Sequence, residues 1–302
     1  MFDNHDPYIK LLPLLCKLHK TEIKLANSEL CKTCTDKKDN LRYFLNGLND
    51  NLKGVRQQFR LNKIDFNYSL RDNRKVYMLA YFPHYIELIY YTLHNKLKDL
   101  FSKKKEINVF FLGGGPLPEL LGFLNLIKKD LPEVNKVNFV HSDINTNWYD
   151  VEIKEITLKM IDNYYGKDII PNHINLNLFQ DFKKVPELIS NADFVISQNC
   201  FNDCSDYETL CDNYYKIWDS MKSNSILAVI DLNFNEIYAA MKKIFNYCIN
   251  AKGKSLMPLA STVKVIKPNI PACPHLERNF YGQSNGTLSK KSTKYYSFAI
   301  LK

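Results

Sequence analysis

The stretch FFLGGGPLPELLG, residues 110–122, places three consecutive glycines between an apolar run and a helix-like segment. The apolar residues before the glycines are typical of a buried strand. A proline stands in the first turn of the following segment, a position that a helix tolerates. Glycines between a strand and a helix let the backbone approach a ligand, and a helix N-terminus favours polar or anionic groups. We therefore expect either a ligand-binding loop or a tight structural turn.

Two common nucleotide-binding loops do not fit this turn. A G-x-G-x-x-G dinucleotide fingerprint starting at Gly113 would need glycine where the chain has Pro118. A triphosphate-binding loop would end in Gly-Lys-Ser/Thr, which the stretch lacks. Dinucleotide and triphosphate binding are therefore disfavoured.

From residue 106 onward, short apolar runs alternate with helical segments. This alternation predicts an α/β fold with a doubly wound, mostly parallel sheet and right-handed crossovers. The last two apolar runs have no helix between them, which indicates antiparallel terminal strands. The expected strands are 107–113, 136–143, 173–179, 192–199, 225–231, 261–267 and 294–302.

The first 105 residues read as a helical region in front of a sheet domain at 106–302. Apolar residues from Leu41 to Val55 recur at helical spacing. A second helical segment covers about 73–101, in which Pro83 starts or kinks a helix. We expect region 1–105 to act as a lid or to recognise a substrate. Within it, the basic and aromatic residues of 59–75 suit RNA phosphates and bases, or form a loop with solvated charges.

The composition is that of a folded protein. Of the 302 residues, 45% are hydrophobic, and the net charge of +9 fits an anionic partner such as RNA or a solvated lysine-rich surface. No apolar run is long enough to span a bilayer, so no membrane partner is expected. The N-terminus is unlike a secretory signal, and eight cysteines without a regular framework suit a reducing, cytoplasmic location.

Polar residues follow three of the expected strands at the edge where doubly wound sheets bind ligands. Asp143 ends the second strand, where a carboxylate either accepts the hydroxyls of an adenosine ribose or caps the next segment. The third strand is followed by Phe179, Gln180 and Asp181, and the fourth by Gln198, Asn199, Asn202 and Asp203. Together these residues indicate one site.

These features resemble the class I S-adenosylmethionine-dependent methyltransferases over residues 106–302. The resemblance rests on the glycine turn with its proline, on Asp143 and on the terminal antiparallel strands. It implies a seven-stranded Rossmann-like sheet and an S-adenosylmethionine site. The implied cofactor-binding residues are Gly113, Gly114, Gly115, Pro116, Glu119, Asp143, Ile144, Phe179, Gln180, Asp181 and Gln198.

The chain departs from the family pattern at two positions, which makes it a divergent member. The family often has an acid two residues before the first glycine, where this chain has Phe111. The family's third glycine is replaced by Leu117. The resemblance therefore implies that another residue holds the methionine end of the cofactor, and Glu119 is the candidate. A catalytically silent, methyltransferase-like scaffold for a ribonucleoprotein or protein partner is the alternative.

Residues after the fourth strand indicate how the methyl acceptor is handled. The segment SQNCFND lacks the prolines of the Asn/Asp-Pro-Pro-aromatic turn that grips amino groups of bases. Asn199 and Asp203 are the expected catalytic residues, which contact or deprotonate the acceptor. Cys200 is either a nucleophile or, as is commoner, a small buried residue. RNA is the preferred acceptor, with a small molecule or a protein as alternatives.

Two further features leave alternatives open. Cys16, His19, Cys31 and Cys34 are spaced compatibly with tetrahedral zinc, or are unliganded thiols with a satisfied histidine. Trp148 and Tyr149 either stack on the cofactor or substrate, or pack at the edge of the sheet.

Overall fold

The computed structural model describes residues 37–60, 67–162, 168–175, 185–201, 204, 206–265 and 292–302. Within these ranges seven strands form one sheet of order β3-β2-β1-β4-β5-β7-β6. Strands β3, β2, β1, β4 and β5 are parallel, and β7 runs antiparallel to both of its neighbours. The predicted fold, a mostly parallel seven-stranded sheet with antiparallel terminal strands, is confirmed.

The strands are formed by apolar runs, and glycine, proline or polar residues mark where these runs begin and end. Their bounds are β1 Glu106–Leu112, β2 Lys136–Asp143, β3 Asp168–Asn175, β4 Phe194–Gln198, β5 Ile226–Leu232, β6 Lys254–Val265 and β7 Ser292–Leu301. All residues of β4 and β5 are buried, as expected for central strands covered on both faces. The strand order reverses between β1 and β4, so ligands are expected at the carboxyl ends of these two strands.

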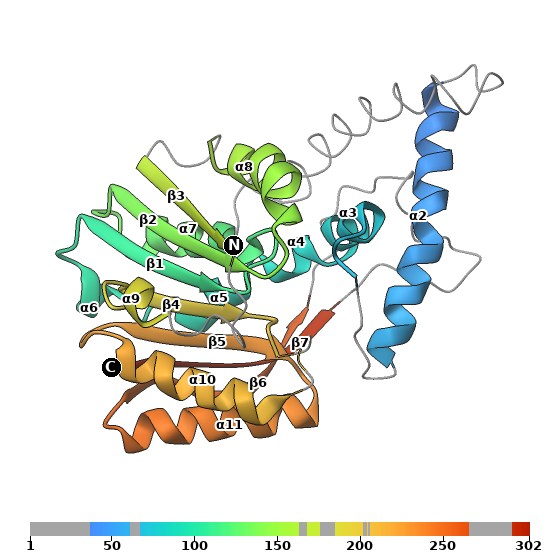
Figure 1. The fold of residues 1–302 in the computed structure, drawn as a ribbon. Coiled ribbons are helices and arrows are strands. Elements are labelled where there is room, and N and C mark those ends of the chain that lie inside the picture. Colours follow the sequence, from blue (N-terminus) through green and yellow to red (C-terminus); the bar gives the residue numbers. More distant parts are fainter. Residues whose placement is uncertain are drawn as a thin grey trace.

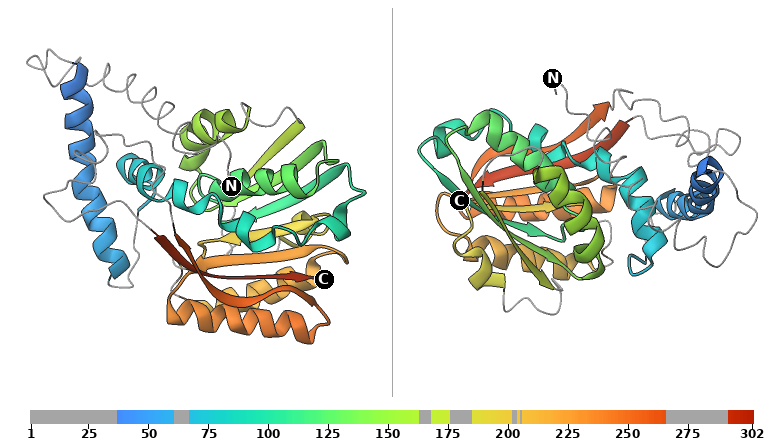
Figure 2. Two further views of the ribbon diagram at one scale, coloured as in Figure 1. Left: turned by 180° about the vertical axis from the view of Figure 1, so that it is seen from behind. Right: turned by 90° about the horizontal axis from the view of Figure 1, so that it is seen from above.

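Helices cover both faces of the sheet. Their bounds are α2 Lys37–Arg60, α3 Arg71–Ala80, α4 Phe82–Tyr85, α5 Leu88–Leu93, α6 Lys98–Phe101, α7 Pro118–Asp130, the π-helix η1 Tyr149–Thr157, α8 Leu158–Asp162, α9 Val185–Ile189, α10 Tyr207–Ser220 and α11 Asn235–Asn250. Helices α10 and α11 lie along one face, and α4, α5 and α7 lie on the other (Figures 1 and 2). None of the helices in the described ranges is long and apolar enough to cross a bilayer.

Two expected strands differ from the structure in their bounds. The third was expected at 173–179, but β3 begins at Asp168 and contains Pro171. Proline is tolerated there because β3 is an edge strand. The sixth was expected at 261–267, but β6 begins at Lys254. Register shifts on either side of Met257 interrupt the alternation of inward- and outward-facing residues, and this alternation is the pattern by which a strand is predicted from sequence.

The N-terminal helices share one apolar core with the sheet. Leu48, Leu52 and Val55 of α2 are buried, which confirms the predicted apolar stripe at these positions. Helix α2 packs on α3 and stands at the side of the molecule (Figure 1). Helix α4 starts at Phe82, directly before Pro83, so the predicted helix start at this proline is confirmed.

The backbone of α7 packs directly against the backbone of the segment that contains α4 and α5. A Cβ atom placed on Gly122 of α7 would lie 1.8 Å from the carbonyl oxygen of Ile86 and 2.9 Å from Cγ2 of Ile89. Only glycine fits this contact without moving a helix. Gly122 therefore fixes how closely the N-terminal helices approach the helix that follows the glycine turn.

We expect Gly122→Ala to lower the free energy of unfolding by roughly 3 kcal/mol, because the added methyl group meets backbone that has no room to move. Gly54→Ala is the matched control, since a Cβ there meets nothing within 4 Å and the residue is exposed in α2. It should stabilise the chain by about 0.5–1 kcal/mol through helix propensity. Urea unfolding measures both, and equal effects of the two substitutions would contradict the packing.

Candidate functional site

The glycine turn has the backbone conformation that requires glycine. Gly113 and Gly115 have backbone φ angles of 59° and 49°, values that residues other than glycine rarely adopt. The Gly114 N–H donates to the carbonyl oxygen of Ser142 in β2 (3.2 Å), and the Leu117 N–H donates to the Gly114 carbonyl oxygen (2.7 Å). One hydrogen bond thus closes the turn internally, and the other joins the turn to the end of β2.

Asp143 connects β2 to this turn. Its carboxylate accepts the backbone N–H of Gly115 (2.8 Å) and the backbone N–H of Asn145 (2.7 Å). Burial raises the pKa of Asp143 to about 6, although both hydrogen bonds act to lower it. Each carboxylate oxygen retains a further lone pair for a ligand. The next residue, Ile144, is 65% exposed and offers an apolar surface beside the carboxylate.

Glu119 lies beneath the glycine turn, in the first turn of α7. The side chain is buried, and its Oε1 has no hydrogen-bond partner in the described part of the chain. A Cβ on Gly114 would lie 2.7 Å from this oxygen and 2.9 Å from Cδ2 of His141. Burial raises the pKa of Glu119 well above its ordinary range, its own backbone N–H offsets part of the rise, and nearby Asp143 adds to it. Two carboxyl groups therefore lie close to the turn.

The exit of β4 brings two amide side chains to the same edge of the sheet. Gln198 is buried, and its Nε2 donates to the carbonyl oxygen of Tyr85 in α4 (3.1 Å). Asn199 adopts the left-handed conformation with a φ angle of 60°, which asparagine tolerates better than most residues. Gln198 Oε1 and both amide atoms of Asn199 are buried and lack hydrogen-bond partners among the described residues.

Cys200 packs against the glycine turn. A Cβ on Gly113 would lie 2.6 Å from the Cys200 Sγ, so this glycine also provides room for the thiol. The thiol donates to the carbonyl oxygen of Leu112 (2.9 Å). Burial raises the pKa of Cys200 well above its ordinary value, and nearby carboxylates add to the rise. Because a nucleophilic cysteine needs a thiolate, the structure favours Cys200 as a small, partly buried residue that packs against the turn.

Several predicted site residues lie outside the described part of the chain. They are Phe179, Gln180, Asp181, Asn202 and Asp203 at the strand exits and Cys16, His19, Cys31 and Cys34 of the zinc set. Within the described ranges, no group of three or more His, Cys, Asp or Glu residues is placed to hold a metal ion.

An aromatic group from two regions covers the glycine turn. A Cβ on Gly115 would lie 3.9 Å from Cε2 and Nε1 of Trp148, and Trp148 is only 2% exposed. The rings of Tyr68 and Tyr77 lie with centroids 5.2 and 5.5 Å from the Trp148 ring. In this structure Trp148 is therefore packed between the N-terminal region and the turn.

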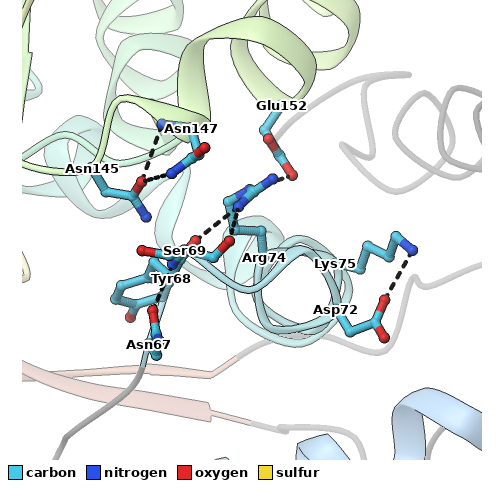
Figure 3. Close-up of polar contacts among 9 residues, drawn as sticks. All are labelled: Asn67, Tyr68, Ser69, Asp72, Arg74, Lys75, Asn145, Asn147 and Glu152. Atoms are coloured by element: carbon cyan, nitrogen blue, oxygen red, sulfur yellow. Dashed lines mark hydrogen bonds and ion pairs between the residues drawn. The ribbon is translucent and has the colours of Figure 1, made fainter.

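A buried ion pair holds this cover in place. Arg74 Nε donates to the Glu152 carboxylate (3.0 Å), and its Nη1 donates to the carbonyl oxygens of Tyr68 (2.9 Å) and Ser69 (3.0 Å) (Figure 3). Both charged side chains are buried. Burial raises the pKa of Glu152, and Arg74 offsets part of that rise. The pair links α3 to η1, whose Thr157 hydroxyl donates to the carbonyl oxygen of Pro116 (2.6 Å).

These contacts bear on the basic segment 59–75, for which the sequence allowed a role in binding RNA. Arg74 is committed to Glu152, and Lys75 pairs with Asp72 (3.0 Å). The ring of Tyr68 faces Trp148. In the described part of this segment, the side chains of Tyr68, Arg74 and Lys75 therefore make contacts within the chain. The Arg74–Glu152 pair could not be predicted from the sequence, because its members lie 78 residues apart.

The chain resembles solved methyltransferase structures at the level of the fold. It matches no protein-family model and no curated protein. A SAM-dependent methyltransferase from Agrobacterium tumefaciens aligns over 73% of this chain and 62% of its own, with 11% identity and a TM-score of 0.43. One from Methanosarcina mazei aligns over 67% and 94%, with 10% identity and a TM-score of 0.39. A precorrin-6y C5,15-methyltransferase from Geobacter metallireducens aligns over 68% and 84%, with 8% identity and a TM-score of 0.38.

The strand order by itself defines the fold. A sheet of order β3-β2-β1-β4-β5-β7-β6 with an antiparallel β7 is the Rossmann-like sheet of the class I S-adenosylmethionine-dependent methyltransferases. The chain therefore has the class I methyltransferase fold.

The Arg74–Glu152 pair should show strong coupling in a double-mutant cycle. We expect Arg74→Leu to lower the free energy of unfolding by about 3–5 kcal/mol, because it leaves the Glu152 carboxylate buried without its partner. Arg74→Leu combined with Glu152→Leu should regain most of that loss. Urea unfolding measures the cycle, with Lys53→Leu and Asp50→Leu as the control for an exposed pair. Additive losses at 74 and 152 would contradict a coupled pair.

Proposed function

We propose that the chain is an S-adenosylmethionine-dependent methyltransferase. The observation that carries the proposal is the Glu119 carboxyl oxygen, which is buried without a partner against Gly114 and close to Asp143. Keeping such a group unpaired costs about 1–3 kcal/mol, so its position calls for a ligand. S-adenosylmethionine carries an ammonium and a sulfonium cation, and it suits a site with two carboxyl groups close together.

The described residues fit distinct parts of this cofactor. The Gly113–Pro116 backbone allows close approach, Asp143 has lone pairs for the ribose hydroxyls, and exposed Ile144 suits a face of the adenine. Glu119 would accept the ammonium group of the methionine end. When bound, S-adenosylmethionine supplies an electrophilic methyl group on its sulfonium sulfur. Phe179, Gln180 and Asp181 remain predicted contacts of the adenine.

The chain's own contribution to catalysis is alignment and exclusion of water. Transfer of a methyl group is an in-line displacement, so holding the acceptor in register supplies most of the rate. Tyr68 and Tyr77 of the N-terminal region pack on Trp148, which lies against Gly115, and these contacts support a role for this region as a lid over the site. Asn199 and Asp203 are the proposed contacts of the acceptor, at the exit of β4.

Isothermal titration with S-adenosylhomocysteine tests the proposal. We expect binding to the wild-type chain and to Gly54→Ala, and binding weaker by about tenfold or more, equal to about 1.4 kcal/mol, in Gly114→Ala. The reason is that a methyl group at position 114 must displace the Glu119 carboxyl group. Absence of binding to the wild type at millimolar ligand would refute the proposal and favour a catalytically silent scaffold.

Binding should also depend on pH through Asp143. The folded chain without ligand holds a proton on Asp143 up to its pKa of about 6, whereas ribose hydroxyls are bound best by the carboxylate. Affinity for S-adenosylhomocysteine should therefore rise with pH, by up to about tenfold per unit below this pKa, and level off above it.

Two variants isolate this dependence. Asp143→Asn removes this titrating group and should bind more weakly, with a shallower rise between about pH 5 and 7, because Glu119 keeps its own raised pKa. Asp212→Asn changes an exposed carboxylate on α10 and should keep the wild-type profile. A wild-type profile that is flat, or a rise that persists unchanged in Asp143→Asn, would exclude Asp143 as the source.

A further inference from the structure

The loop between β2 and η1 places the Trp148 ring on the glycine turn. Trp148 is 2% exposed, and a Cβ on Gly115 would lie 3.9 Å from its Cε2 and Nε1. The ring therefore lies against the backbone of the turn, at the end of the sheet where ligands are expected. A ligand that approaches Gly115 from this side must displace the ring.

Short-range hydrogen bonds hold the loop that carries Trp148. The Asn145 side-chain oxygen accepts the backbone N–H and the amide of Asn147 (3.1 and 2.8 Å) (Figure 3). The Trp148 N–H donates to the Asn145 carbonyl oxygen (3.4 Å). Ile144 and Asn147 are exposed. Because these bonds lie within the loop, it can move as a unit while the sheet stays intact.

One buried ion pair connects η1 to the N-terminal region. Arg74 contacts Glu152 through Oε1 (3.0 Å), and Glu152 Oε2 is buried without a hydrogen-bond partner among the described residues. The same guanidinium binds the carbonyl oxygens of Tyr68 and Ser69, so it also positions the ring that packs on Trp148. A pair made through one oxygen holds less firmly than the two-point pair that arginine can form with a carboxylate.

The winding of η1 is unusual for a helix that anchors such a contact. Its nine residues form a π-helix, and the following Leu158 N–H donates to the Ile153 carbonyl oxygen, five residues earlier. π-Helices are rare, mostly single turns, and frequent at functional sites. The end of η1 is bound to the glycine turn through Thr157 and Pro116. Rewinding η1 to an α-helix would rotate Trp148 relative to Thr157, because an α-helix places fewer residues in each turn.

We propose that Trp148 is the plug of a gate on the glycine turn, that the Arg74–Glu152 pair is its latch, and that η1 rewinds from π- to α-helix when the gate opens. The effect of the gate on S-adenosylmethionine rests on the function proposed above. With the gate closed, Trp148 covers the turn, and the ligand binds only to the open form. The observed association constant is then that of the open form multiplied by the fraction of open molecules.

Fluorine NMR of the full chain labelled with fluorotryptophan follows the gate without any ligand. The chain has two tryptophans, so Trp148→Phe assigns both signals, and buried Trp218 is the internal reference. Glu152→Gln keeps the shape of the side chain and removes the charge that holds Arg74. We expect it to raise the open fraction of Trp148, measured by saturation transfer, by roughly fivefold, because the charged hydrogen bond becomes a neutral one.

The gate also predicts that a weaker latch improves binding. Glu152→Gln should bind S-adenosylhomocysteine with an association rate and an affinity roughly fivefold above the wild type, although its free energy of unfolding falls. An ion pair with a structural role alone would leave the affinity unchanged or lower it. Tyr68→Leu, which removes the ring beside Trp148, should act in the same direction. Glu208→Gln, the same exchange in the exposed pair with Lys243, should match the wild type.

Two results would overturn the gate and leave the methyltransferase function standing. One is a Glu152→Gln variant whose Trp148 signal and association rate equal those of the wild type, or whose affinity is lower. The other is a wild-type Trp148 signal that stays in its closed position in saturating S-adenosylhomocysteine. If S-adenosylhomocysteine binds neither the wild type nor Glu152→Gln, the proposed function fails. The signal of Trp148 without ligand then decides whether the gate exists.

Discussion

The fold and the candidate site both depend on the absence of a side chain at Gly113. Its positive φ angle turns the chain out of β1, and the space above it is filled by the Cys200 thiol, which comes from the neighbouring strand. Two residues on, the Gly115 N–H is bound by Asp143 at the end of β2. The ends of three strands therefore meet at one turn. A side chain at 113 would separate β4 from β1 at the place where ligands are expected to bind.

The central strands could be predicted from the sequence because burial on both faces leaves continuous apolar runs. Strands β1, β2, β4 and β5 lie within one or two residues of their expected bounds. The edges were harder for the same physical reason. An edge strand tolerates proline and irregular register, so Pro171 in β3 and the bulges near Met257 in β6 concealed several residues of strand.

The sequence located the turn, Asp143 and the exit of β4, because each follows a recognisable strand. The sequence could not show which of the first hundred residues contact these parts of the site. The Gln198–Tyr85 hydrogen bond joins residues 113 apart, and Trp148 contacts Tyr68 and Tyr77, which lie 80 and 71 residues earlier in the chain. These contacts depend on how α4 packs on α7 and how α3 packs on α4, which local periodicity does not encode. Part of the basic segment 59–75, which the sequence indicated as suited to RNA, therefore makes contacts within the chain instead.

The two departures from the family pattern compensate each other. Phe111 is fully buried, with Phe123 and Phe139 at centroid distances of 6.2 and 6.1 Å, so a carboxylate at position 111 would face an apolar core. Leu117 adopts a φ angle of 64°, rare for a bulky residue, at the point where α7 begins. This entry brings Glu119, two residues later, beneath Gly114 and into the first turn of a helix, where the helix dipole favours a negative charge. Under the proposed function, Glu119 on the helix would replace the acid that the family often carries on the strand, and Leu117 keeps the left-handed backbone that a glycine would otherwise supply.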